Sequence, residues 1–422
     1  MADKNLYKKL IFEYQQFAVS MSYIPRNISV DLTHCNVFVG LRRSGKTFLM
    51  YQCIGSLMES GMKKEEVLFI NFEDDRIPSL SLSDLDIFKT CYEEMFETRP
   101  VFFLDEIQQV KGWEKFARRL ADTGYKVFIT GSNASMLSME IASVLGGRYA
   151  LTEVYPFSFT EYLEAKDVKL EKGWQYLRES EIKRNLTSYL SLGGLPEIPF
   201  TPPEFQRKWI SNLFDRIYFG DIVTRYGVRK PEGLRTMIRK LVESVGQLLS
   251  INRISSIISS AGSKIRMETV AEYLDYARNT WLIFSVENYD GKLAEKISNL
   301  KYYFIDNAFL TLFKDEDMDS RLLENMVAVT LRRIYREKIF FYKRNVEIDF
   351  YIPDVSVAVQ VSWSLDDEST RKRELSALEL LHEHHPLKKA VVVTYDSEDD
   401  VTLSSGLEVH IRPLWKWLIE EK

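Results

Sequence analysis

A glycine-rich run near the amino terminus has the spacing that binds phosphate. Residues 40–47 follow the Walker A pattern G-x-x-x-x-G-K-[ST] at every required position. We expect a strand over Asn36–Val39 before the run and a helix from Lys46 after it. Inward-turned backbone N–H groups and a helix N-terminus both favour an anion, so the pattern predicts a nucleotide phosphate site. The candidate nucleotide-binding residues are Gly40, Leu41, Arg42, Arg43, Ser44, Gly45, Lys46, Thr47 and Phe48.

A pair of adjacent carboxylates supplies the second half of this chemistry. Four apolar residues at 101–104 end in Asp105 and Glu106, which is the Walker B pattern. The carboxyl end of a buried strand is where α/β sheets bind ligands. We expect Lys46 to reach the β- and γ-phosphates, and Thr47 and Asp105 to hold Mg²⁺. Glu106 would polarise the attacking water. ATP and Mg²⁺ are therefore the expected cofactors.

Two further polar positions follow the next expected strands. Asn133 or Ser132 could hydrogen-bond the γ-phosphate or the water, and either could also cap a helix expected over Ala134–Val144. Arg148 could neutralise transition-state charge in a neighbouring subunit, or it could form a salt bridge within the core. The sequence leaves these alternatives open, and it leaves the oligomeric state open as well.

The elements that must position these residues alternate between strands and helices in the first third of the chain. Near-continuous apolar runs separated by helical patterns indicate a parallel α/β sheet covered on both faces. The expected strands are 36–39, 67–72, 101–104, 125–130 and 149–155, and the expected helices include 46–60 and 113–122. Helical patterns then dominate, including 182–192, 205–222 and 234–249. Strands return at 301–305, 340–343, 347–352, 357–361 and 390–394.

The composition of the 422 residues is that of a globular protein with two to four domains. Hydrophobic residues make up 45% and charged residues 28%. No apolar run approaches the ~18 residues of a membrane helix, and the first residues lack the apolar core of a signal peptide. Three widely spaced cysteines fit neither a disulfide framework nor a zinc site. We therefore expect a cytoplasmic protein with no membrane partner. The net charge of −5 excludes a surface that clamps nucleic acid all over.

The motifs taken together resemble one family, the prokaryotic AAA-type ATPases that carry a C-terminal domain of unknown function. The resemblance extends from about residue 20 to residue 419. Its motifs are 40–47, 71–74, 105–108, 130–133, 147–149, 154–159, 161–163, 193–196, 301–306 and 412–417. It implies ATP binding, a P-loop NTPase sheet of the additional-strand type, a winged helix and a restriction-nuclease-like α/β tail. The expected domains are a helical lead-in (1–30), the ATPase core (31–160), a helical lid (161–205), the winged helix (206–300) and the nuclease-like tail (301–422).

The middle of the chain is a candidate for contact with DNA. Residues 234–300 fit a helix-turn-helix, with Ile283–Tyr289 as a wing and with Lys264 and Arg266 in the turn. Residues 204–275 contain 12 Lys and Arg against 8 Asp and Glu, opposite to the chain as a whole. Duplex DNA is therefore a possible partner. The alternative is that this module serves as a lid of the ATPase or as a contact for a protein partner.

The tail resembles nucleases of the PD-(D/E)xK kind, whose sites need two acidic or amide groups for Mg²⁺ and a lysine. Asp349 follows Glu347 on one expected strand, and Gln360 lies on the partner strand, with Glu324 available from a helix. Ser362 occupies the lysine position. Lys343 is a possible substitute. Because so little of the required set is present, we expect a binding or scaffold domain, with nuclease activity unlikely.

The expected function is Mg²⁺-dependent ATP hydrolysis that drives or gates a conformational change, with DNA as a candidate partner. Two alternatives stay open. One is a slow regulatory nucleotide switch that binds a protein partner. The other is an ATP-gated DNA-processing factor or nuclease.

Overall fold

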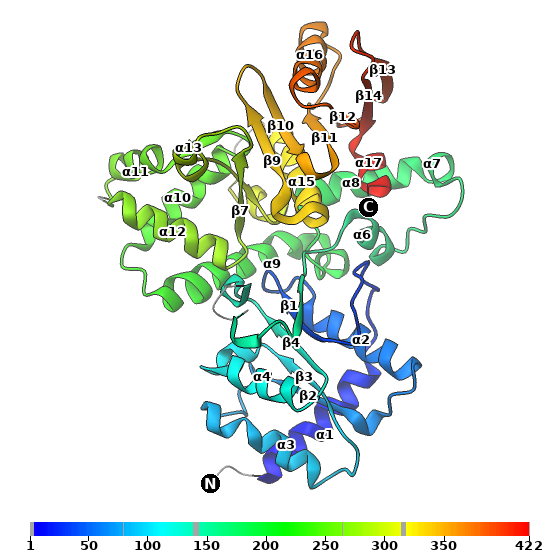
Figure 1. Cartoon of the computed structure of the whole chain (residues 1–422), viewed down its shortest axis with the longest axis vertical. Coiled ribbons are helices and arrows are strands. Elements are labelled where there is room, and N and C mark those ends of the chain that lie inside the picture. The colour runs from blue at the N-terminus through cyan, green and yellow to red at the C-terminus, as the bar shows by residue number, and fades with distance from the viewer. Residues whose placement is uncertain (1–3, 79, 138–142, 264, 314–317, 422) are drawn as a thin grey trace. The chain divides into compact units, whose positions relative to one another are not determined.

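The computed structural model describes residues 4–78, 80–137, 143–263, 265–313 and 318–421, and it divides the chain into two compact units (Figure 1). Unit 1 comprises Met1–Tyr155 with Asn279–Trp281. Unit 2 comprises Pro156–Arg278 with Leu282–Lys422. The finer domain boundaries at residues 30, 160, 205 and 300 stay predictions. No helix in the described ranges is both long enough and apolar enough to cross a membrane.

Unit 1 is built on a five-stranded parallel sheet with the strand order β2-β3-β4-β1-β5. The β4 strand separates β1, which precedes the glycine-rich run, from β3, which ends in the acidic pair. This order is the additional-strand arrangement that the family resemblance implied, and the expected parallel α/β class is confirmed. The strands are β1 (Cys35–Val39), β2 (Val67–Asn71), β3 (Val101–Asp105), β4 (Val127–Gly131) and β5 (Tyr149–Glu153).

The strands of unit 1 are apolar because helices cover them. Phe38, Phe103 and Phe128, from three different strands, pack with Leu49 and Ile54 of α2 in one buried cluster. The helices are α1 (Lys4–Ser20), α2 (Lys46–Glu59), α3 (Asp86–Glu93) and α4 (Trp113–Asp122), with 3-10 turns η1 (Lys64–Glu66), η2 (Leu82–Asp84), η3 (Ile107–Gln109) and η4 (Ala134–Leu137). The helix expected over 134–144 falls partly outside the described residues, and its described start is 3-10 helical.

Unit 2 begins with helices, and one of the expected helices is wrong at its end. The helix expected over 234–249 stops at Glu243. Gly246 then adopts φ +76°, a left-handed turn that glycine favours, and Leu248–Ser250 forms the strand β6. Lys264 of the predicted turn lies outside the described residues. The helices are α6 (Phe159–Ala165), α7 (Trp174–Leu177), α8 (Glu179–Leu192), η5 (Ile198–Phe200), α9 (Pro203–Asp215), a π-helical continuation η6 (Arg216–Thr224), α10 (Pro231–Glu243), α11 (Ile251–Ser260) and α12 (Met267–Asn279).

A single nine-stranded mixed sheet runs through the rest of unit 2, in the order β13-β14-β12-β11-β10-β9-β7-β8-β6. Its strands are β6, β7 (Ile283–Asn288), β8 (Asn299–Phe304), β9 (Phe340–Lys343), β10 (Glu347–Ile352), β11 (Val357–Val361), β12 (Lys389–Thr394), β13 (Asp399–Thr402) and β14 (Glu408–Pro413). The remaining helices are α13 (Leu293–Ser298), α14 (Asn307–Thr311), α15 (Asp319–Tyr335), η7 (Arg336–Lys338), η8 (Pro353–Val355), α16 (Glu368–His384) and α17 (Leu414–Glu420).

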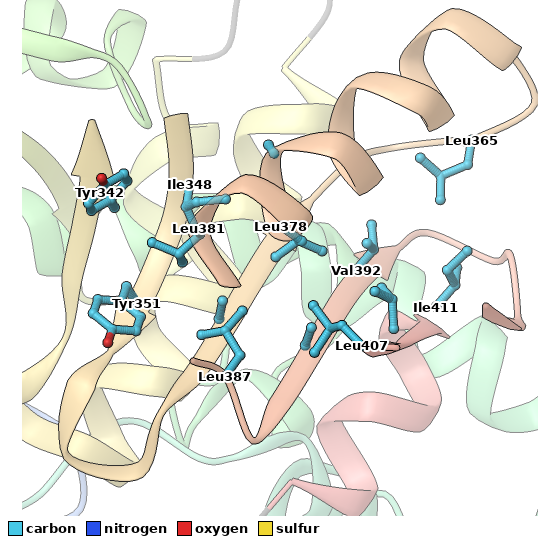
Figure 2. Close-up of a cluster of buried hydrophobic side chains, with 14 residues drawn as sticks. Tyr342, Ile348, Tyr351, Leu365, Leu378, Leu381, Leu387, Val392, Leu407 and Ile411 are labelled. Carbon is cyan, nitrogen blue, oxygen red and sulfur yellow. The ribbon is translucent and has the colours of Figure 1, made fainter. Parts of the chain in front are cut away.

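The core of the tail lies between α16 and this sheet. Leu378 and Leu381 of α16 face Ile348 of β10, Val392 of β12 and Ile411 of β14, and all five side chains are fully buried (Figure 2). Within this sheet β10 and β11 pair antiparallel, with Phe350 opposite Val359. Those two strands carry the polar residues predicted for the tail.

Candidate nucleotide site

The glycine-rich run forms the loop between β1 and α2. A Cβ atom on Gly40 would lie 2.1 Å from the carbonyl oxygen of Val154, so no larger residue fits at this position. Gly45 precedes α2 and provides no side chain to cap the first N–H groups of that helix. The Ser44 hydroxyl is fully buried and has no hydrogen-bond partner among the described residues. The loop therefore presents backbone amides and a buried hydroxyl, which are groups that bind phosphate.

The ammonium of Lys46 lies inside this loop. Its side chain is 3% exposed, and Nζ donates to the carbonyl oxygens of Gly40, at 3.2 Å, and Leu41, at 3.0 Å. Glu106 Oε1 lies 3.6 Å away. The sequence predicted that Lys46 would bind phosphate, and the structure brings Lys46 together with Glu106, the second carboxylate of the acidic pair.

Asp105 and Thr47 are in direct contact. Thr47 Oγ1 donates to Asp105 Oδ1 at 2.9 Å, and Thr130 Oγ1 of β4 donates to the same oxygen at 2.6 Å. Burial, with the neighbouring Glu106 charge, raises the pKa of Asp105 to about 7. Mg²⁺ prefers oxygen ligands of this kind and keeps several waters, so a hydroxyl beside a carboxylate fits the ion. The contact of Thr130 with Asp105 was not predicted from the sequence. The signal that the sequence offers is that Thr130 is a polar residue in an apolar strand.

Glu106 has a left-handed backbone, with φ 56° and ψ 38°. Its N–H donates to Thr130 Oγ1 at 2.8 Å, which holds this uncommon conformation. The side-chain amide of Gln108 donates to its carboxylate. Burial alone would raise the pKa of Glu106, but Lys46, Gln108 and Arg42 together lower it. Glu106 is therefore the member of the pair that stays ionised.

The two sensor candidates lie in different positions. Ser132 is 4% exposed, and its Oγ lies 3.4 Å from the Gln108 amide that also contacts Glu106. Asn133 follows at the start of η4, where its carbonyl accepts from Met136 N at 3.1 Å. The structure therefore connects Ser132 to the carboxylate network through Gln108.

Arg148 lies at the opposite end of the sheet from the glycine-rich loop. It precedes β5, and the parallel register pairs Tyr149 with Cys35 at the start of β1, whereas the loop follows the end of β1. Its side chain is 39% exposed and forms an ion pair with Asp122 of α4. Arg148 is thus not brought to the site of its own chain, and its action on a neighbouring subunit stays a prediction.

The remaining loop residues have structural partners. Leu41 is buried, and Phe48 is 44% exposed with its ring edge-on to Tyr51. Arg43 has φ 63°, a left-handed conformation within the loop. The Arg42 guanidinium forms two hydrogen bonds with the carboxylate of Glu73, at 2.7 and 3.1 Å. Arg42 is therefore anchored to the turn after β2, beside the nucleotide loop.

Arg26 is a second residue that the sequence did not reveal. Its side chain is 5% exposed. Nη1 donates to the Ser44 carbonyl at 2.9 Å, and Nη2 donates to the Tyr155 carbonyl at 2.7 Å. Arg26 thus joins the glycine-rich loop to the last residue of the first segment of unit 1. Nothing in its sequence neighbourhood marks it, because both partners are distant in the chain.

The residues predicted in the tail lie in unit 2 and form a separate group. Asp349 N donates to Gln360 Oε1 at 2.7 Å, so these two are neighbours on β10 and β11. Glu324 lies on α15. Lys343 Nζ forms an ion pair with Glu347 at 2.7 Å. Ser362 Oγ donates to the Ser364 carbonyl at 2.9 Å, within its own loop.

Two segments of the chain match known family models. Residues 33–163 match a model described as an AAA domain, and residues 183–319 match a model described as a domain of unknown function, DUF8612. The first match contains the whole parallel sheet together with Lys46, Thr47, Asp105 and Glu106. Unit 1 therefore contains an AAA-type P-loop domain.

Two relatives resemble the chain over most of its length. The uncharacterized protein MJ1544 of Methanocaldococcus jannaschii is 31% identical over 431 residues, covering 99% of this chain and 96% of the relative. An uncharacterized protein of Haemophilus influenzae is 31% identical over 391 residues, covering 90% and 93%. Among solved structures, the Walker-type ATPase paby2304 of Pyrococcus abyssi is 13% identical, with a TM-score of 0.41 over 74% of this chain and 96% of that one.

Proposed function

We propose that this chain, which belongs to the same family as the uncharacterized protein MJ1544 of Methanocaldococcus jannaschii, is a Mg²⁺-dependent ATPase. The observation that carries the proposal is the meeting of Lys46 and Thr47, from the start of α2, with Asp105 and Glu106, from the end of β3. Phosphoryl transfer needs a cation for the phosphates, oxygen ligands for the metal and a carboxylate for the water. These four side chains supply all three.

Each side chain then has one task. Lys46 leaves the carbonyls of the loop and binds the β- and γ-phosphates. Thr47 and Asp105 hold Mg²⁺, which would neutralise phosphate charge when bound. Glu106 is ionised and accepts a hydrogen bond from the attacking water, which makes the water a better nucleophile. Ser132 or Asn133 orients the water or the γ-phosphate. Hydrolysis then drives or gates a conformational change.

Steady-state ATP hydrolysis in Mg²⁺ tests the proposal, together with binding of a fluorescent ATP analogue. Lys46→Ala should lose nucleotide binding. Glu106→Gln should keep binding while its turnover falls by about a hundredfold or more, because the base is removed. Lys111→Ala and Glu114→Gln, on and before α4, are matched controls that should behave like the wild type. Wild-type turnover in Glu106→Gln would show that another group activates the water.

A second candidate function is a nucleotide switch that contacts a protein partner through unit 2. The element order α10-β6-α11-α12-β7-β8, with β8 between β6 and β7, supports a winged helix in this segment. The helix that would enter a DNA groove is α12, and it exposes Glu268, Glu272 and Asp275. Carboxylates repel the phosphate backbone, so this face favours a protein contact over a DNA groove.

DNA contact through other surfaces of the same module is tested directly. The exposed Arg235 and Arg239 lie on α10, a different helix from α12, which carries the three acidic residues. Hydrolysis should be measured with and without duplex DNA at stated salt, at several protein concentrations. A slow rate that DNA does not change supports the switch. Strong stimulation that Arg235→Glu with Arg239→Glu abolishes, and that Glu268→Gln leaves intact, would support a DNA-dependent ATPase instead.

A further inference from the structure

A buried lysine lies at the centre of the carboxylate group in the tail. The Lys301 side chain, on β8, is 1% exposed. Its Nζ lies 3.1 Å from Glu347 Oε1, 3.4 Å from Asp349 Oδ1 and 4.0 Å from Glu324 Oε1. The three acids come from β10 and α15. Carboxylates from two other elements therefore converge on one ammonium group.

The Glu324 carboxylate is fixed in place from two sides. Tyr303 OH donates to Oε1 at 2.8 Å. Glu324 also packs directly against Gly246, where a Cβ atom would lie 2.1 Å from Oε2. The left-handed Gly246, in the turn between α10 and β6, thus also makes room for this acid. The position of the Glu324 carboxylate is therefore determined by contacts with Tyr303 and Gly246 inside the fold.

The Asp349 carboxylate is fixed in the same way. Its Oδ2 accepts a hydrogen bond from Val361 N at 2.9 Å, and its own N–H donates to Gln360 Oε1 at 2.7 Å. The Gln360 amide in turn donates to Glu374 Oε2 at 2.7 Å, on α16. Asp349 therefore presents its second oxygen, Oδ1, to Lys301 from a rigid position.

The Lys301 ammonium offsets part of the negative charge of the three acids. Burial works against the charge on Lys301, but Asp349, Glu324 and Glu347 outweigh it, so the pKa of Lys301 is raised. Burial, with the Asp349 charge, raises the pKa of Glu324 to about 7. A buried ammonium that is surrounded by carboxylates stays charged, because losing its proton would leave buried anions unpaired.

A nuclease-like tail implies Mg²⁺ at this position, and the residues do not fit that ion. Ser362 stands at the lysine position of such sites. Among the described residues, no group of three or more His, Cys, Asp and Glu side chains is arranged to hold a metal. The carboxylates face an ammonium instead, and a divalent ion in contact with them would lie within a few ångströms of a second positive charge.

We propose that Glu324, Glu347 and Asp349 form a cation site whose resident cation is the Lys301 ammonium, and that this ammonium closes the site to divalent metal. The tail then keeps a nuclease-like arrangement of acids without a metal and serves as a binding or scaffold domain. The three acids are not arranged to hold a metal while the ammonium lies between them, and removing Lys301 should allow them to close on one. This inference is independent of the nucleotide site in unit 1.

The test is Mn²⁺ binding to the nucleotide-free, full-length protein, measured by electron paramagnetic resonance. Any Mn²⁺ bound at the nucleotide site is common to all variants. Lys301→Met should bind Mn²⁺ at least about tenfold more tightly than the wild type, because one positive charge at 3–4 Å is gone. The gain should disappear in Lys301→Met with Asp349→Asn. Lys343→Met is the matched control, because Lys343 also pairs with Glu347 but lies outside the buried centre, and it should behave like the wild type.

Two results would overturn the inference. One is wild-type Mn²⁺ binding that Asp349→Asn removes, since the site would then accept a metal beside Lys301. The other is a folded Lys301→Met that gains no Mn²⁺. If Lys301→Met does not fold, the comparison between wild type and Asp349→Asn decides: equal Mn²⁺ binding supports the closed site, and a loss of binding in Asp349→Asn refutes it.

Discussion

Arg26 offers a direct test of how the nucleotide loop is held in shape. Its guanidinium donates to Ser44 O in the loop and to Tyr155 O, both at hydrogen-bonding distance and both in the interior of unit 1. Its backbone is anchored separately, because Arg26 N donates to Gln52 Oε1 at 2.7 Å. Replacing Arg26 with methionine removes these guanidinium bonds but keeps a side chain of similar length and the backbone anchor.

The expected loss of stability in Arg26→Met follows from the hydrogen bonds that the two carbonyl groups lose. A hydrogen bond from a charged donor contributes about 1.5–3 kcal/mol, so two of them contribute about 3–6 kcal/mol. Water that enters the space recovers part of this, and we expect the free energy of unfolding to fall by about 2–4 kcal/mol. Because Ser44 belongs to the loop, part of the effect should appear in binding. We expect the Kd for ATP to rise by about tenfold or more.

The assay combines urea unfolding with titration of a fluorescent ATP analogue and steady-state hydrolysis. Arg119→Met is the matched control, since Arg119 forms an exposed ion pair with Asp86 that contributes about 1 kcal/mol or less. The control should change neither quantity measurably. A loss of stability in Arg26→Met with wild-type ATP binding would mean that Arg26 supports the fold alone. Unchanged stability in Arg26→Met would contradict the stabilising role of the buried hydrogen bonds to Ser44 and Tyr155.

Three further outcomes can be checked with single substitutions. Thr130→Val should lower kcat more than it lowers ATP affinity, because it removes the hydroxyl that accepts from Glu106 N and donates to Asp105. Thr130→Ser keeps the hydroxyl and should have the wild-type kcat. A wild-type kcat in Thr130→Val would contradict this role. Burial raises the pKa of Asp306 from 3.8 to about 6, so the stability contributed by its protonated form is complete below about pH 3 and is lost as pH rises through 6. The stability advantage of wild type over Asp306→Asn, measured by urea unfolding, should shrink by about 2 kcal/mol between pH 4 and 7. Leu378→Ala should lower the free energy of unfolding by about 2–5 kcal/mol while ATP-analogue binding stays at the wild-type level, because it opens a cavity in the tail core and leaves unit 1 unchanged (Figure 2).

Short-range patterns were enough to predict the loop and the strand end that form the candidate nucleotide site. The helix α2 begins at Lys46, within the run Gly40–Thr47, and the apolar residues before Asp105 form most of β3. In each case the backbone geometry of a strand end or a helix start is set by neighbours within a few residues. The parallel class of the first sheet follows from the same alternation of strands and helices. Arg148 precedes β5 whereas the glycine-rich loop follows β1, so in a parallel sheet the two lie at opposite ends, as the structure shows.

The roles of Arg26, Thr130 and Lys301 were decided by tertiary structure alone. Arg26 contacts a carbonyl 129 residues away, Thr130 meets Asp105 across 25 residues, and Lys301 meets Asp349 across 48. A buried donor or charge acquires its partners only when the strand order is set, since β4 must lie beside β3, and β8 near β10, before those side chains meet. The sequence alone determined the glycine-rich loop proposed to bind phosphate, because eight consecutive residues build that loop. The tertiary structure decided what supports the loop and what occupies the carboxylate cluster, because burial and charge pairing are properties of neighbours in space.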